Sequence, residues 1–214
     1  MAENFFQLND LACGRGARLL FAGVNLELRP GDAALTTGPN GSGKSSLLRV
    51  IAGLIPPFGG GIIWNGDDVR RTPDNFRTAL RYVGHSDGLQ PTLSVIENLR
   101  YWATLYGSPI DIVTLTKGLD SVGLADLTNL PVRVLSAGQR RRLALARAIS
   151  TGGRIWLLDE PTVALDAQSI RNVETAISTF RDEGGIVVAS TNAPINLPCA
   201  ESIDLIAYQW EEDH

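Results

Sequence analysis

One glycine-rich segment, Gly38–Ser45 with the sequence GPNGSGKS, restricts the possible folds of this chain more than any other feature. It matches the pattern GxxxxGK followed by Ser or Thr, and it lies between a predicted strand, Ala33–Thr37, and a predicted helix, Ser45–Leu54. Glycines let successive backbone N–H groups converge on phosphate oxygens, and the helix N-terminus adds positive potential at the same point. The segment predicts a phosphate-binding site inside an α/β fold, although an isolated match could be a chance turn.

Apolar runs elsewhere in the chain support a parallel sheet. Ile155–Leu158 and Ile186–Ala189 show no alternation, as expected of central strands with helices on both faces. The first thirty residues instead alternate around glycine-rich turns and predict antiparallel strands at Phe5–Leu8 and Val24–Leu28. Gly61–Trp64 predicts the first strand of a hairpin. We expect a mainly parallel core with an N-terminal antiparallel β lobe.

The region of about residues 86–135 carries a mostly helical pattern. Its candidate helices, Ser94–Tyr106 and Ile110–Val122, are separated by Gly107 and Pro109. We expect this region to form a helical lobe inserted into the α/β core. A chain of 214 residues, 44% of them hydrophobic, is long enough for one sizeable core, so we expect a single domain over residues 1–214.

Two adjacent acids end the predicted strand that begins at Ile155, and a buried strand end is a poor place for carboxylates without a cation. We expect Asp159 to hold Mg²⁺ together with the hydroxyl of Ser45, phosphate oxygens and water. Glu160 is the candidate general base for an attacking water, and Lys44 is expected to reach the β- and γ-phosphates. Either acid alone could be an ordinary residue of a strand-to-loop junction. Here the two acids occur together in a chain that also contains a complete phosphate loop, which favours the functional interpretation.

Charge and composition narrow the classes of partner. The chain has a net charge of −4 and a pI near 5.2, so it has no excess of basic residues and we expect no nucleic-acid partner. We expect the run Arg140–Arg142 to lie on a solvated or acid-facing helix surface.

No charge-free apolar run reaches the roughly 18 residues that cross a bilayer, and the first ten residues do not resemble a secretory signal. Cys13 and Cys199 lie outside any CxxC pattern and give no support for a zinc site or a disulfide framework.

Upstream of the two acids, Leu135–Gln139 (LSAGQ) resembles the signature LSGGQ of ABC ATPases with Ala137 in place of the first glycine, and Pro161–Asp166 is similar to the D-loop of that family. The resemblance covers nearly the whole chain. It implies a P-loop nucleoside triphosphatase fold with a RecA-like core, ATP and Mg²⁺ as ligands, and ATPase activity. Ser136 is also a good N-cap for a helix running to about Ile149. In the family this helix end closes over the nucleotide of a second copy, which implies a head-to-tail dimer.

Three positions depart from the family pattern. His85 stands where most members have a glutamine; it could order a water near the metal or be a surface histidine, with Gln90 as a nearby substitute. Asn192 stands at the usual histidine position, and its amide can donate a hydrogen bond to phosphate but carries no charge, which predicts slow hydrolysis. Arg15 stands where an aromatic residue usually stacks on adenine, a role that a guanidinium can also fill. The expected catalytic residues are Lys44, His85, Glu160 and Asn192, the metal ligands are Ser45 and Asp159, and the nucleotide contacts are Arg15, Gly38, Pro39, Asn40, Gly41, Ser42, Gly43, Lys44, Ser45, Ser46, Ser136, Gly138 and Gln139.

Four stretches, Cys13–Arg15, Tyr82–His85, Leu93–Leu99 and Leu135–Arg142, are together similar to the haem-exporter ATP-binding subunits of bacterial cytochrome c maturation. This resemblance implies a complex with integral membrane subunits of the CcmB and CcmC types, and a peripheral position on the cytoplasmic face of the bacterial inner membrane. We expect the membrane subunit to contact the surface around His85–Asn98. Two alternatives remain: an ABC ATPase for another substrate, and an ATP-binding regulatory module with little or no hydrolysis.

Overall fold

The computed structural model describes residues 5–16 and 18–209, apart from the side chain of Arg15. Within these residues the strands are β1 (Phe6–Arg15), β2 (Arg18–Leu28), β3 (Ala33–Thr37), β4 (Gly59–Trp64), β5 (Asp67–Asp68), β6 (Leu80–Val83), β7 (Ile155–Asp159), β8 (Ile186–Ser190) and β9 (Glu201–Asp204). The α-helices are α1 (Lys44–Ile51), α2 (Pro73–Ala79), α3 (Val95–Leu105), α4 (Ile112–Ser121), α5 (Ala137–Ser150) and α6 (Ala167–Asp182). Short 3-10 turns are η1 (Ala125–Leu127), η2 (Val132–Val134) and η3 (Leu205–Tyr208).

The five-stranded sheet has the order β6-β7-β8-β3-β9, and every neighbouring pair in it is parallel. This confirms the predicted α/β fold with central strands near 155–158 and 186–189, where every residue of β7 and β8 is buried. Because the strands are parallel, their carboxyl ends lie along one edge of the sheet. The phosphate loop after β3, the two acids at the end of β7 and the residues after β8 therefore meet at that edge.

The antiparallel sheet has the order β2-β1-β4-β5, and β4 and β5 form the predicted hairpin. Strand β1 runs far beyond the predicted Phe5–Leu8. Its register with β2 shifts between Leu8 and Leu11, and Asp10 has a φ of 49°. Such an irregularity interrupts the alternation of apolar residues, which is why the pattern alone predicted too short a strand.

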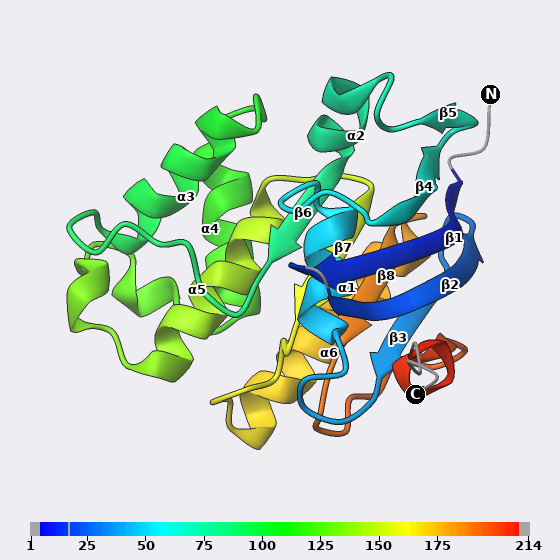
Figure 1. The fold of residues 1–214 in the computed structure, drawn as a ribbon. Helices are drawn as coiled ribbons and strands as arrows, with labels where there is room; N and C mark the ends of the chain where they lie inside the picture. The colour runs from blue at the N-terminus through cyan, green and yellow to red at the C-terminus, as the bar shows by residue number, and fades with distance from the viewer. Residues whose placement is uncertain (1–4, 17, 210–214) are drawn as a thin grey trace.

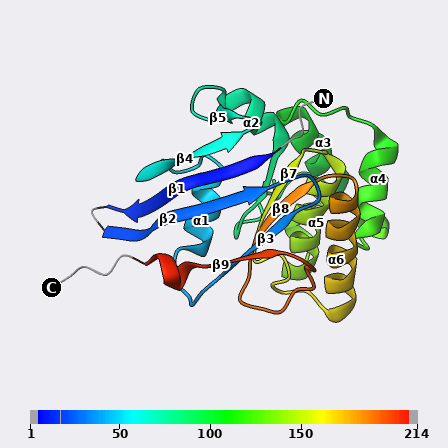
Figure 2. The ribbon, with the colours of Figure 1, turned by 90° about the vertical axis from the view of Figure 1, so that its right-hand side faces the viewer.

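Helix α1 lies between the two sheets (Figures 1 and 2). Its residues Leu47, Leu48 and Ile51 join one buried cluster with residues of both sheets, including Leu157 of β7 and Val188 of β8. The helix ends before the predicted Leu54, because Ala52 is its C-cap and Gly53 follows with a φ of 69°. The burial of α1 fixes the phosphate loop at its N-terminus.

Helices α5 and α6 cover the other face of the parallel sheet (Figure 2), where Ala144 and Ala148 of α5 pack with Trp156 of β7. The opposite side of α5 contributes Leu143 and Ala146 to a separate cluster with α3 and α4. The predicted helices in this region form at α3 and α4, which lie to one side of the sheet in Figure 1. One helix, α5, thus packs against both the sheet and the helical region.

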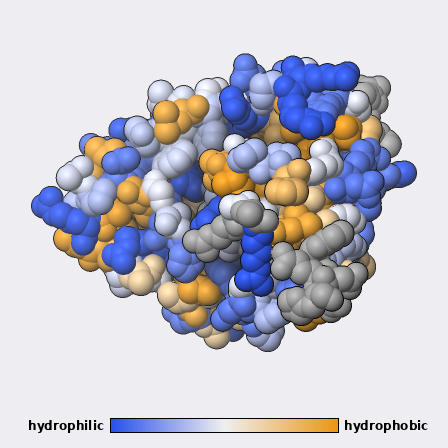
Figure 3. All heavy atoms as spheres, viewed as in Figure 1, coloured by the Kyte–Doolittle hydropathy of each residue, from blue (hydrophilic) through white to orange (hydrophobic). Residues whose placement is uncertain are grey.

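Among the described residues, no helix combines the length and apolar character that a bilayer crossing requires. On the face seen in Figure 3, apolar side chains occur in small patches separated by polar ones.

Candidate functional site

The predicted phosphate loop forms the connection between β3 and α1. Gly43 is the N-cap of α1 with a φ of 105°, and a Cβ atom there would lie 2.9 Å from the ring of Phe21. No side chain of the described residues caps this helix end, so its first N–H groups are available to an anion. The cavity at this end has a volume of about 230 Å³ and is lined by Leu20, Asn40, Gly41, Gly43, Lys44, Ser45, Ser46, Glu160 and Asn192.

The ammonium group of Lys44 lies within this loop. Its Nζ donates to the carbonyl oxygens of Gly38 at 2.6 Å and Pro39 at 3.1 Å. It also donates to Oδ1 of Asn192 at 2.8 Å. The side chain is buried, so three oxygens replace the water that a lysine ammonium normally binds. Phosphate oxygens could take the place of these neutral acceptors, because an anion binds the ammonium more strongly.

Asp159 ends β7 and is completely buried. Its Oδ1 accepts hydrogen bonds from Ser45 Oγ at 2.9 Å and from Ser190 Oγ at 2.6 Å. Its Oδ2 has no hydrogen-bond partner among the described residues. A buried carboxylate oxygen without a partner is unfavourable unless a cation binds it, and Mg²⁺ prefers such oxygen ligands. The residues present therefore fit a magnesium ion held between Ser45, Asp159 and phosphate oxygens.

Glu160 follows β7 and has a φ of 52°, which lies in the left-handed region that residues other than glycine rarely adopt. Its carboxylate accepts two hydrogen bonds from Asn192, from the backbone N–H to Oε2 at 3.0 Å and from Nδ2 to Oε1 at 2.6 Å. Nδ2 also donates to Oδ1 of Asn40 at 2.9 Å. The structure thus brings Lys44, Glu160 and Asn192 together, with Asn192 between the other two.

Of the three positions that depart from the family pattern, only Asn192 is seen in this cavity. His85 is exposed in the segment after β6 and is not among the residues that line the cavity. Gln90 is held toward α3 instead, because its backbone N–H donates to Oδ1 of Asn98 at 2.8 Å. Arg15 ends β1 opposite Arg18, and its side chain lies outside the described atoms. The sequence motifs did not identify Leu20, an apolar residue that also lines the cavity.

The LSAGQ segment forms the N-terminus of α5 and closes it with a capping box. Ser136 Oγ accepts from the backbone N–H of Gln139 at 3.2 Å, and Gln139 Oε1 accepts from that of Ser136 at 2.8 Å. Ala137 is exposed, so its methyl group is tolerated where ABC ATPases have a glycine. Gly138 is the constrained position, because a Cβ there would lie 2.7 Å from the carbonyl oxygen of Ala164. Neither Ser136, Gly138 nor Gln139 lines the cavity beside Lys44.

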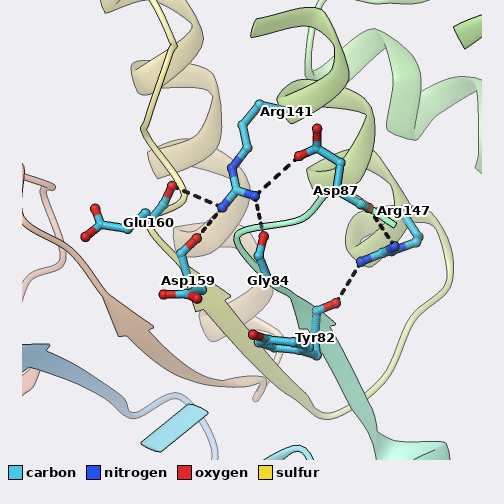
Figure 4. A network of polar contacts seen from close by, with 7 residues as sticks. All are labelled: Tyr82, Gly84, Asp87, Arg141, Arg147, Asp159 and Glu160. Carbon is cyan, nitrogen blue, oxygen red and sulfur yellow. Dashed lines mark hydrogen bonds and ion pairs between the residues drawn. The ribbon is translucent and has the colours of Figure 1, made fainter. Parts of the chain in front are cut away.

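The run Arg140–Arg142 was predicted to lie on a solvated or acid-facing surface; Arg141 does face the carboxylate of Asp87, but it is not solvated. Its side chain is buried between α5 and the sheet, with 5% of the residue exposed. Nη1 donates to the carbonyl oxygen of Gly84 at 2.7 Å, and Nη2 donates to the carbonyl oxygens of Asp159 and Glu160 (Figure 4). Burial lowers the pKa of this guanidinium, and the carboxylate of Asp87, 3.6 Å away, acts in the opposite direction.

A signal for the burial of Arg141 exists in the sequence. Leu145 and Ala148 follow it by four and seven residues, which places all three on one face of the helix. That face packs against the sheet. The prediction gave more weight to the three consecutive arginines than to this spacing, because a basic run usually indicates a solvated surface.

A family model described as ABC transporter matches residues 21–163. The cytochrome c biogenesis ATP-binding export protein CcmA of Paramagnetospirillum magneticum is 44% identical over 215 residues, which cover 100% of this chain and 99% of the relative. The protein of the same name from Rhodospirillum rubrum is 46% identical over 204 residues, covering 95% and 87%. A solved ABC transporter ATP-binding protein from Pyrococcus furiosus has a TM-score of 0.85 and 27% identity, covering 96% of this chain and 100% of that one.

Proposed function

We propose that this chain, which belongs to the ABC transporter family, is the ATP-hydrolysing subunit of an export complex for cytochrome c biogenesis. One observation supports the catalytic part of this proposal most directly. Lys44, Glu160 and Asn192 line one cavity at the carboxyl ends of parallel strands, next to the start of α1. Their chemistry is that of phosphoryl transfer to water: a cation for the phosphates, a carboxylate for the water and an amide between them.

In the nucleotide complex, Lys44 and the N–H groups at the start of α1 bind the β- and γ-phosphates. Lys44 then exchanges its bonds to Gly38, Pro39 and Asn192 for bonds to phosphate. Ser45 and Asp159 would hold Mg²⁺, which would supply positive charge beside the phosphate oxygens. Ser190 keeps the Asp159 carboxylate oriented through its hydrogen bond to Oδ1.

Glu160 accepts the proton of the attacking water, and its position depends on Asn192. Two hydrogen bonds from Asn192 hold both carboxylate oxygens of Glu160. Once Lys44 has moved to the phosphates, the Asn192 amide can also face them as a neutral donor. Hydrolysis is therefore real but slow, because the transition state gains no positive charge at this position.

A second copy of the chain completes each nucleotide site in this proposal. The capped N-terminus of α5, with Ser136 and Gly138, does not line the cavity of its own chain. Ser136 and Ala137 are exposed, so they are accessible to another molecule. Head-to-tail pairing places this helix end, with Gln139, over the nucleotide held by the partner copy.

The membrane subunits are proposed to dock beside the lobe of residues 86–135, near the surface of His85–Asn98. A groove of about 710 Å³ lies there between α2 and α3, lined among others by Leu54, Arg77, Tyr82, Ser86, Trp102 and Leu105. Leu54 and Leu105 are exposed apolar residues that a partner could cover. The likeness to CcmA proteins favours CcmB-type and CcmC-type partners, haem as the exported cargo, and a peripheral position on the cytoplasmic face of the bacterial inner membrane.

Co-purification followed by an ATPase assay tests the proposal. The tagged chain is expressed in its own host, the membrane proteins that co-purify are identified, and phosphate release by the purified complex is measured with and without Mg²⁺. We expect a membrane subunit to co-purify and Mg²⁺-dependent turnover to follow. Undetectable turnover, with ATP still promoting dimerisation, would instead favour a regulatory module, and a membrane subunit of another transport system would favour a different substrate.

A further inference from the structure

The guanidinium of Arg141 joins three segments that are far apart in the sequence. It binds the carbonyl oxygen of Gly84 after β6, and the carbonyl oxygens of Asp159 and Glu160 at the end of β7. It also lies 3.6 Å from the carboxylate of Asp87. Figure 4 shows the guanidinium at the centre of these groups, with the carboxylates of Asp159 and Glu160 directed away from it. Arg141 therefore donates to the backbone of the two acids and not to their carboxylates, which lie on the side of the nucleotide site.

The contact with Glu160 matters because the backbone there is in an unfavourable conformation. Glu160 has a φ of 52°, which a residue with a side chain keeps only when its surroundings hold it. Its N–H donates to the carbonyl oxygen of Ser190 at 2.9 Å. Its carbonyl oxygen accepts from Arg141 Nη2 at 3.0 Å and from the N–H of Val163 at 3.2 Å. Among the residues that the structure describes, Arg141 makes the only side-chain hydrogen bond to this carbonyl oxygen, and the bond is charge-assisted.

The other contacts of the network link this carbonyl to the helical region. Arg147, which lies six residues after Arg141 on α5, donates to the carbonyl oxygens of Asp87 at 3.1 Å and Tyr82 at 2.7 Å. Its guanidinium also lies 4.2 Å from the centre of the Trp102 ring of α3. Two buried arginines of one helix thus hold the segment 82–87, which borders the proposed docking groove.

We infer that Arg141 is a positioning residue for hydrolysis: it holds Glu160 in its left-handed backbone conformation and ties that conformation to the segment 82–87. This inference rests on the proposed function, in which Glu160 serves the attacking water. A lysine cannot replace Arg141, because one ammonium nitrogen cannot reach Gly84, Asp87 and the β7 carbonyl oxygens together, whereas the planar guanidinium does. The role concerns the rate of hydrolysis and leaves the phosphate loop, and hence ATP affinity, intact.

The test compares Arg141→Lys and Arg141→Gln with Arg142→Lys and Arg142→Gln. Arg142 is a matched control on the same helix, because its Nη1 donates to the carbonyl oxygens of Val122 and Gly123 and makes no described hydrogen bond to the backbone of Asp159 or Glu160. The dissociation constant of ATP is measured on the isolated chain, and kcat and KM on the complex with its membrane subunits. We expect the Arg141 variants to lose kcat by roughly 10- to 100-fold while the dissociation constant and KM change less than about threefold. The Arg142 variants should keep kcat.

A double-mutant cycle separates positioning of Glu160 from a general structural defect. If Arg141 acts through Glu160, Arg141→Gln has little further effect on the residual rate in a Glu160→Gln background. Where Arg141 variants fail to fold, Asp87→Asn replaces them, since it removes the ion pair at a partly exposed residue and should lower kcat without changing KM. Unchanged kcat, a parallel loss of ATP affinity, or additive effects in the cycle would overturn the inference. A wild-type complex without ATP turnover would overturn the proposed function itself.

Discussion

Asn192 holds the carboxylate of Glu160 through two hydrogen bonds, one from its backbone N–H at 3.0 Å and one from its side-chain amide at 2.6 Å. The same side chain accepts a hydrogen bond from Lys44 at 2.8 Å. Asn192 therefore connects the candidate base, Glu160, with Lys44, the candidate phosphate-binding residue. Asn192 contacts both groups, and in the proposed nucleotide complex phosphate oxygens would replace its contact with Lys44.

We expect Asn192→His to raise the ATPase rate of the assembled complex by roughly tenfold or more, because a protonated imidazole adds positive charge where the γ-phosphate reacts. Steady-state phosphate release measures this. Asn192→Asp is the matched control, since it keeps the size of the side chain but places a second carboxylate beside Glu160. We expect that variant to be slower than wild type. An unchanged rate in Asn192→His would show that charge at this position does not limit hydrolysis.

Lys44→Ala should weaken ATP binding by about 10- to 100-fold, because it removes a charge-assisted contact to the phosphates. The dissociation constant can be measured by calorimetry on the isolated chain. The only other lysine of the chain, Lys117, is exposed on α4, so Lys117→Ala is the natural control and should bind ATP as wild type does. Equal affinity of the two variants would contradict the assignment of the phosphate site.

Asp159→Asn should separate stability from metal binding. Without ligand, the neutral amide removes an unpaired buried carboxylate oxygen, so the melting temperature should stay the same or rise. With Mg²⁺ and ATP at 100 times the dissociation constant, wild type should gain about 2.7 kcal/mol of stability, and the variant should lose the Mg²⁺-dependent part of that gain. Thermal melts with ATP, with and without Mg²⁺, measure both effects. A full Mg²⁺-dependent gain in the variant would exclude Asp159 as a metal ligand.

Gly138→Ala should impair hydrolysis much more than Ala137→Gly. A methyl group at Gly138 would lie 2.7 Å from the carbonyl oxygen of Ala164, whereas Ala137 is exposed. The backbone near Ala164 must shift, at a cost of about 1–3 kcal/mol for overpacking. ATP affinity of the isolated chain should be unchanged in both variants, while ATP-dependent dimerisation, followed by light scattering, should fail only in Gly138→Ala. Normal dimerisation of that variant would argue against this close contact.

Acid should weaken the hairpin between β4 and β5 at Asp68. Hydrogen bonds from the Arg70 side chain and backbone lower the pKa of Asp68 from 3.8 to about 2. Because the folded pKa lies below the unfolded one, the pair stabilises the chain fully above about pH 4 and is lost as the pH falls toward 2. The urea midpoint of Asp68→Asn should therefore be lower than that of wild type at pH 6, and the two should converge near pH 2. A difference that persists at pH 2 would point to another cause.

Local patterns in the sequence determined the main elements of this protein. The phosphate loop, the apolar strands at β7 and β8, and the Ser136 cap depend on contacts among close neighbours, so residue type and spacing were sufficient to predict them. Strand β1 was predicted too short, because an irregular register with β2 breaks the alternation that marks a strand.

The tertiary structure alone decided how the site is connected. Asn192 meets Lys44 across 148 residues and Glu160 across 32, and Arg141 reaches Gly84 across 57 residues. Such contacts follow from the order of strands in the parallel sheet and from the packing of α5 against it, neither of which a local pattern contains. The run of three arginines therefore predicted a solvated or acid-facing surface, whereas the fold buries the middle one between the carboxylate of Asp87 and the backbone of the candidate base.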